Sequence, residues 1–110
     1  MKRAAALLIA ASCAPGLATE PPGRAKAQPC APCHGALGLG VTPDAPHLAG
    51  QPQIYLAAQL RAFRSGKRQH EVMNVIAKAL SDDGIEALAQ WYASIPIETK
   101  ARPGPVRNTP

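Results

Sequence analysis

The feature that most constrains this chain is the stretch Cys-Ala-Pro-Cys-His at residues 30–34, followed directly by Gly35. The chain has 110 residues and three cysteines, and two of these cysteines stand three positions apart with a histidine directly behind the second. Three kinds of chemistry use a Cys-x-x-Cys pair: thiol–disulfide exchange, structural zinc binding and covalent haem attachment. The rest of the sequence has to decide among them.

Two of these chemistries lack the residues that they need. A thioredoxin-like pair stands beside a βαβ pattern, and no alternating strand pattern occurs in this sequence. A structural zinc site takes four ligands, but there is no second cysteine pair, and the three histidines are scattered as His34, His47 and His70. Thiol–disulfide exchange and zinc binding are therefore disfavoured.

Covalent haem attachment accounts for every residue of the motif. The sulfurs of Cys30 and Cys33 can each bond one former vinyl group on one edge of the porphyrin, and the two-residue spacer sets their separation. His34 then lies under the ring, where its Nε2 atom can bind the iron. The motif predicts one covalently bound haem c.

The composition also favours a bulky apolar cofactor. The sequence holds one tryptophan, two tyrosines and one phenylalanine, beside 12 prolines and 9 glycines. A domain of this size buries a limited fraction of its surface and is marginal unless something adds to its core. We therefore expect the domain to be largely unfolded without haem.

Residues 1–18 have the layout of a cleaved secretory signal. Lys2 and Arg3 precede an uninterrupted apolar run at residues 4–11. That run is well short of the roughly 20 residues that a membrane-spanning helix needs. We predict export to the periplasm, with cleavage near Ala18.

Cys13 offers an alternative to a freely diffusing mature protein. It follows Ile-Ala-Ala-Ser, which loosely resembles a bacterial lipoprotein signal, so a lipid anchor at Cys13 is the less favoured reading. Cleavage near residue 18 leaves a domain at 19–99 and a tail at 100–110 whose composition is typical of disorder. It also leaves ten basic against seven acidic residues, a mild excess that makes no case for nucleic-acid binding.

Periodicity predicts an all-α domain. A short helix is expected between Pro22 and Pro29, and the glycines and prolines of residues 35–52 predict a long functional loop. A firmer helix is expected between Pro52, which suits a first turn, and Gly66, which suits a stop. Its apolar face carries Leu56, Leu60 and Phe63.

Two further helices follow. Residues 71–80 are predicted to form one with Val72, Ile76 and Ala79 pointing inward. Ser81 is the expected N-cap of the last helix, which Pro96 ends. Its apolar stripe carries Ile85, Leu88, Ala89 and Tyr92.

Met73 is the predicted second ligand of the iron. It is the only methionine after the predicted cleavage site, and it follows His34 by 39 residues, enough chain to pass around a haem edge. Methionine opposite histidine raises the reduction potential of a haem iron. The competing ligand is His70, whose polar neighbours instead suggest an exposed side chain.

The ordered series of motifs resembles the class I cytochromes c, and among them the small bacterial monohaem cytochromes. The resemblance covers roughly residues 22–96 and is carried by CAPCHG, PHLAGQ at 46–51, YLAAQLRAFRSGKR at 55–68, VM at 72–73 and LSDDGIEALAQWYAS at 80–94. It implies three to four short helices wrapped around one haem. It also implies that the carbonyl of Pro46 accepts a hydrogen bond from the second nitrogen of the axial histidine.

The resemblance has two further implications. The N-terminal helix should cross the C-terminal helix, which pairs Gly23–Ala27 with Trp91 and Tyr92, although Pro29 departs from the usual unbroken helix. The function implied is one-electron transfer without catalysis. The alternatives are a dedicated electron-transfer subunit of a dehydrogenase or oxidase and, less favoured, an enzyme or sensor with an open iron position.

The expected partners are redox proteins such as respiratory or dehydrogenase components. One basic group is a possible docking patch, and the competing interpretation is a solvated helix end. The group consists of Arg61, Arg64, Lys67 and Arg68.

Overall fold

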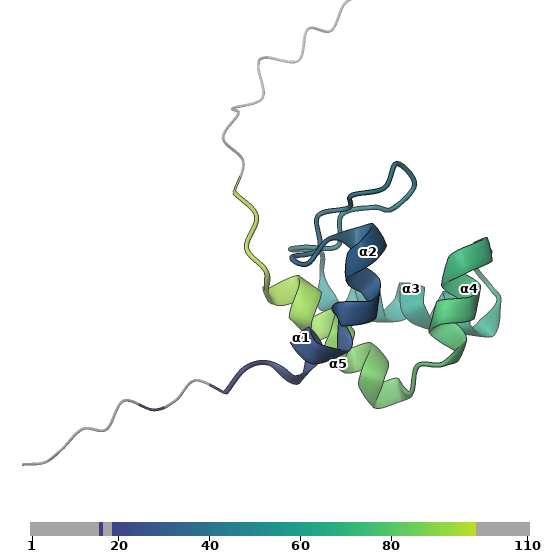
Figure 1. The fold of residues 1–110 in the computed structure, drawn as a ribbon. Coiled ribbons are helices and arrows are strands. Elements are labelled where there is room, and N and C mark those ends of the chain that lie inside the picture. The colour runs from purple at the N-terminus through teal and green to yellow at the C-terminus, as the bar shows by residue number, and fades with distance from the viewer. Residues whose placement is uncertain (1–15, 17–18, 99–110) are drawn as a thin grey trace, which may run out of the picture.

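The computed structural model describes residue 16 and residues 19–98, and every regular element in that part of the chain is helical (Figure 1). In chain order the elements are α1 (Pro22–Lys26), a 3-10 turn (Gln28–Cys30), α2 (Ala31–His34), α3 (Gln53–Ser65), α4 (Glu71–Lys78) and α5 (Asp82–Ser94). The all-α prediction is confirmed. The predicted signal, except for Gly16, and the predicted tail at 100–110 lie outside the described residues, as does Cys13.

The first predicted helix is interrupted rather than continuous to Pro29. Helix α1 ends at Lys26, and Pro29 lies in the 3-10 turn that follows. Proline has no N–H with which to continue α-helical hydrogen bonding, so the chain tightens into a 3-10 turn there. Helix α2 then begins at Ala31 and ends before Gly35, whose φ of 76° lies in the left-handed region that favours glycine.

The core lies where α5 packs against α1 and α3. The predicted apolar stripe of α5 is confirmed, because Ile85, Leu88, Ala89 and Tyr92 are all buried. On α3, Leu56 and Phe63 are buried as predicted and Leu60 packs against the same cluster. The buried apolar side chains of the described part are small, since half of them are alanine. The protein core alone is therefore modest.

Helix α1 crosses α5 at a glycine. A Cβ atom added to Gly23 would lie 2.0 Å from the carbonyl oxygen of Ala87 and 2.6 Å from Cβ of Trp91, so only glycine allows this approach. Ala27, which follows α1, belongs to the same buried cluster as Tyr92. The expected crossing of the first and last helices is thus present.

The boundaries of the longer helices agree with their predicted signals to within a residue or two. Pro52 precedes α3 rather than beginning it, and Gly66 ends the helix with φ 79°. The hydroxyl of Ser81 accepts a hydrogen bond from the N–H of Gly84 (3.0 Å), so Ser81 caps α5 as expected. None of the helices in the described part has the length and apolar character required to span a bilayer.

Helix α4 departs from its predicted orientation. It packs on α3 through Ala77, which is fully buried, whereas the side chains predicted to point inward are exposed: Val72 is 51% and Ile76 38% exposed, and Ala79 is also exposed. Val72 and Ile76 do lie on an apolar face of α4, but no protein element in the described residues covers that face. Periodicity identifies an apolar face and does not say what lies against it.

Candidate functional site

The cysteine–histidine motif spans two consecutive tight turns. Cys30 is the last residue of the 3-10 turn, and Cys33 and His34 end α2. Cys30 is partly buried, Cys33 is exposed, and both thiols are free. One short piece of backbone therefore presents two sulfurs and an imidazole without a disulfide between the sulfurs.

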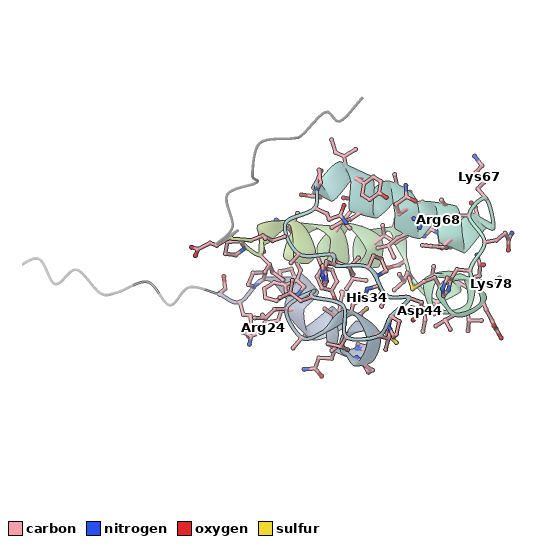
Figure 2. The ribbon with its side chains drawn as sticks, turned by 90° about the horizontal axis from the view of Figure 1, so that it is seen from above. Arg24, His34, Asp44, Lys67, Arg68 and Lys78 are labelled. Atoms are coloured by element: carbon pink, nitrogen blue, oxygen red, sulfur yellow. The ribbon has the colours of Figure 1, made fainter. Side chains whose placement is uncertain are left out.

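His34 is held in a defined orientation. It is only 8% exposed, and its Nδ1 atom lies 2.9 Å from the carbonyl oxygen of Pro46. A carbonyl oxygen can only accept, so Nδ1 must carry the proton and donate it. Nε2 of the neutral ring is then unprotonated, with a lone pair for a metal. The hydrogen bond expected between His34 and Pro46 is present, and Figure 2 shows His34 well inside the molecule.

The loop that carries Pro46 is tied at both ends. The N–H of Val41 donates to the carbonyl of Cys33 (2.9 Å), which ties the loop back to α2. The N–H of Gly50 donates to the carbonyl of Tyr92 (2.9 Å), which ties it to the end of α5. These bonds fix the Pro46 carbonyl, and through it the His34 ring, on backbone that is anchored to the core.

Met73 lies in the first turn of α4 and is half-buried. Helix α4 packs only on α3 and makes no packing contact with α2, so the predicted ligands His34 and Met73 come from elements that do not touch each other (Figure 1).

His70, the competing ligand, has one ring nitrogen engaged. It is the N-cap of α4, where Nδ1 accepts from the N–H groups of Val72 and Met73 at 3.3 Å each. Its Nε2 lies 4.0 Å from a carboxylate oxygen of Asp44. A cap that already uses Nδ1 and faces a carboxylate with Nε2 is a poor source of a lone pair for iron. These contacts favour Met73.

The loop after α2 and helix α4, which adjoin the predicted ligands in the chain, carry exposed apolar side chains. They are Leu37, Leu39, Val41, Val72, Val75 and Ile76, each at least 38% exposed. Large contiguous apolar surfaces on a small protein usually belong to a binding site. Two thiols, an imidazole with a free Nε2, a thioether and apolar walls are the donor set that suits haem c. The residues present fit the group.

The state of the thiols does not suit disulfide chemistry. Burial raises the pKa of the Cys30 thiol, and the nearby Tyr92 hydroxyl only partly opposes this. A reactive redox pair depends on a lowered thiol pKa. Within residues 19–98, no three His, Cys, Asp or Glu side chains gather as a metal cluster.

The basic group on α3 is largely paired within the molecule. Arg61 binds Glu86 (2.5 Å) and Arg64 binds Asp82 (2.6 Å), and the arginines lower the pKa of both carboxyl groups. Arg68 stacks over the ring of Phe63 at 4.6 Å. Two of the four cations, Arg61 and Arg64, therefore help to hold α3 against α5, which favours the interpretation of a helix end over that of a docking patch.

Sequence reasoning missed two residues beside Met73. His70 was assigned an exposed side chain, and although it is exposed it also caps α4. Asn74 was not singled out, yet its amide makes three hydrogen bonds at the start of α4. The sequence did contain a signal for Asn74, which stands next to the only methionine of the predicted domain. Asparagine disfavours helix interiors unless its side chain has a local hydrogen-bond partner, so its position in a predicted helix indicates such a partner.

Known proteins resemble this chain over most of the described region. The Cytochrome c family matches residues 22–95. The chain is 45% identical to a thiosulfate dehydrogenase electron acceptor of Stutzerimonas stutzeri over 69 residues, which is 60% of this chain and 32% of that protein. It is 37% identical to cytochrome c-554(548) of Halomonas halodenitrificans over 75 residues, which is 66% of this chain and 90% of that protein.

A solved structure agrees with the sequence matches. Reduced cytochrome c4 from Pseudomonas stutzeri superimposes with a TM-score of 0.57 and 35% identity, over 61% of this chain and 38% of that one. The chain thus spans about a third of the electron acceptor and of cytochrome c4, and nearly all of cytochrome c-554(548). The family match, the shared helical fold and the cysteine–histidine motif lead to one conclusion: this chain belongs to the cytochrome c family and holds covalently bound haem c.

Proposed function

We propose that this chain passes single electrons through a six-coordinate haem c, attached at Cys30 and Cys33 and ligated by His34 and Met73. The observation that carries the ligand assignment is the hydrogen bond from His34 Nδ1 to the Pro46 carbonyl, which leaves Nε2 free for the iron. When bound, the haem supplies the one-electron chemistry of its iron, and the protein supplies binding, orientation and electrostatics.

Each residue has a separate task in this proposal. The Cys30 and Cys33 sulfurs hold the porphyrin edge as thioethers, and the Pro46 carbonyl keeps the His34 ring in place and makes its Nε2 more basic. The Met73 thioether would be the second protein ligand of the iron and would favour the reduced state. With both ligands retained in both oxidation states, little has to move during transfer, and no position is left for substrate.

The ligand pair is tested by Met73→Ala. The oxidised wild-type protein should show the weak red-edge absorption of a thioether on ferric haem. The variant should lose this band, have a lower reduction potential and bind carbon monoxide. Lys78→Ala, on the same helix and exposed in the wild type, is the matched control and should change none of these. An unchanged spectrum and potential in Met73→Ala would assign the sixth position to another residue, with His70 tested next.

We further propose that the carrier works in the periplasm. The support is the sequence of residues 1–18, with its basic start and short apolar run. N-terminal sequencing of the native protein should find a free terminus near Thr19. A blocked and lipidated Cys13 would instead make it a membrane-tethered carrier with the same haem chemistry.

The electron donor that we propose is a dehydrogenase, because similar proteins are named thiosulfate dehydrogenase electron acceptors. The direct test mixes the oxidised holoprotein with a thiosulfate dehydrogenase and follows the haem spectrum when thiosulfate is added. Rapid reduction that depends on the dehydrogenase is expected, and reduction no faster than without it would exclude this donor. Purification of the native protein separates a dedicated subunit, which leaves the column with its dehydrogenase, from a free shuttle.

A further inference from the structure

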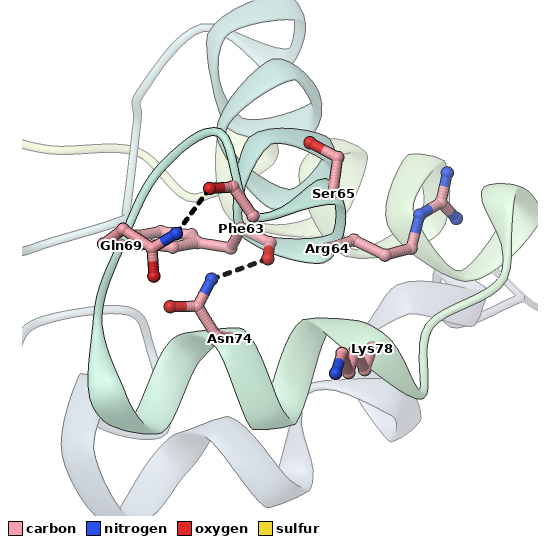
Figure 3. A pocket seen from close by; sticks show the side chains of 7 residues that line it. Phe63, Arg64, Ser65, Gln69, Asn74 and Lys78 are labelled. Atoms are coloured by element: carbon pink, nitrogen blue, oxygen red, sulfur yellow. Dashed lines mark hydrogen bonds between the residues drawn. The ribbon is translucent and has the colours of Figure 1, made fainter.

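The side chain of Asn74 joins three segments around the start of α4. Its Nδ2 atom donates to the carbonyls of Phe63 and Arg68, both at 2.8 Å, and its Oδ1 atom accepts from the N–H of His70 at 2.7 Å. Both hydrogens of the amide group and its oxygen are therefore used. Figure 3 shows the bond from Asn74 to Phe63 at the pocket behind this turn.

The bonded groups lie in the last turn of α3 and in the segment that connects α3 to α4. Phe63 lies in the last turn of α3, where carbonyls have no partner within the helix. Its ring is buried, with the His70 ring edge-on at 6.3 Å and the Arg68 guanidinium over its face. The Asn74 amide therefore fastens the first turn of α4 to backbone that is itself anchored in the core.

In the sequence, Met73 lies between His70, which caps α4, and Asn74. The His70 ring accepts from the Met73 N–H, and the next side chain in the chain is that of Asn74. Helix α4 packs on α3 alone among the described elements, and Ala77 is its one fully buried residue. Beside this packing, polar bonds place the first turn of α4 and the Met73 backbone, and Asn74 makes three of them.

We propose that Asn74 is the positioning residue of Met73, and that its two donated hydrogen bonds keep the first turn of α4 where the methionine sulfur stays on the iron. This role rests on the proposed assignment of Met73 as a ligand. Asn74 does not touch the haem in this proposal and acts only through the backbone of α4. An opening of this turn would release the sulfur while the rest of the domain stays folded.

The pocket behind the turn supplies a matched control. A hollow of about 300 Å³, lined by Phe63, Gln69, Asn74 and their neighbours, brings solvent to the back of the turn. The amide of Gln69 donates to the Gly66 carbonyl at 2.6 Å in the same connecting segment, but it makes no bond to α4 (Figure 3). Gln69→Ala removes an amide from the same pocket without releasing the methionine turn.

The experiment measures imidazole binding to the oxidised holoprotein, together with the red-edge band and the reduction potential, well below the unfolding temperature. Asn74→Ala should bind imidazole about five- to tenfold more tightly than wild type, the factor expected from losing about one net hydrogen bond that favours the closed state. It should also show a weaker band and a lower potential. Asn74→Asp keeps the acceptor for the His70 N–H but loses both donations, so it should behave like Asn74→Ala.

Three results would overturn the proposal. In the first, both Asn74 variants have wild-type imidazole affinity, band and potential, or change no more than Gln69→Ala does. In the second, neither Asn74 variant matures into a folded holoprotein, which would make Asn74 a general structural residue. In the third, Met73→Ala itself leaves the band and potential unchanged, which refutes the ligand assignment and the Asn74 role with it. The Met73→Ala result therefore distinguishes failure of the assignment from failure of the positioning role alone.

Discussion

Replacing Gly23 by alanine tests the crossing of α1 over α5 directly. The new Cβ atom would lie 2.0 Å from the Ala87 carbonyl oxygen and 2.6 Å from Cβ of Trp91, whereas ordinary van der Waals contact lies at 3.4–4 Å. Neither obstacle is the end of a flexible side chain, so α1 itself has to shift. Because α1 leads through Ala27 into the haem-attachment motif, this shift is transmitted to the packing beneath the site.

Two opposing effects set the size of the change. Alanine is favoured over glycine in a helix interior by about 1 kcal/mol, and by less in a helix of only five residues. Overpacking in a tightly packed contact costs about 1–3 kcal/mol. The cost of the overlap exceeds the gain in helix propensity, so we expect Gly23→Ala to destabilise the holoprotein by about 1–2 kcal/mol. For a domain of this size, that is a fall in Tm of roughly 5–15 °C.

Thermal unfolding of the holoprotein, followed by far-ultraviolet circular dichroism, measures this change. Ala25→Ser is the control, because Ala25 lies on the exposed side of the same helix α1. The control should unfold within a few degrees of wild type, since surface and helix substitutions that create no overlap have small effects. A Gly23→Ala protein that unfolds at or above the wild-type temperature would refute the argument from the close approach.

Three shorter predictions follow from the same structure. Cys30→Ser combined with Cys33→Ser should leave a largely unfolded chain, because the protein core is modest without haem; native-like circular dichroism in this variant would contradict that. The contribution of the Arg64–Asp82 pair should be fully present above the unfolded-state carboxyl pKa of about 4 and be lost as pH falls through the lowered folded pKa of Asp82. The stability difference between wild type and Arg64→Gln should therefore shrink in acid, and a difference independent of pH down to about 2 would show that the pair does not contribute. Reduction of the haem by its donor should depend weakly on salt, because Arg61 and Arg64, two of the four cations of the basic group, are already paired with carboxylates; a steep fall in rate in stopped-flow measurements would instead support the docking patch.

Local sequence determined much of this protein. Cys30, Cys33 and His34 stand within one stretch of five residues, and of the chemistries that use a cysteine pair only haem attachment uses all three side chains. The stripes of α3 and α5, the cap at Ser81 and the stop at Gly66 were also predictable, because helix periodicity and capping depend on residues a few positions apart. The hydrogen bond between His34 and Pro46 was anticipated from the family resemblance rather than from any local rule.

Tertiary structure decided what lies against each face. The apolar stripe of α4 was read as inward-facing, but α4 contacts α3 through Ala77 and leaves Val72 and Ile76 uncovered. The pairing of the basic group on α3 also depends on α5, which follows it in the chain. The role of Asn74 is invisible in sequence for the same reason, since its amide bonds to carbonyls 6 and 11 residues away. A sequence pattern states which side chains share a face, whereas their partners are set by how distant segments pack, and no local preference encodes that.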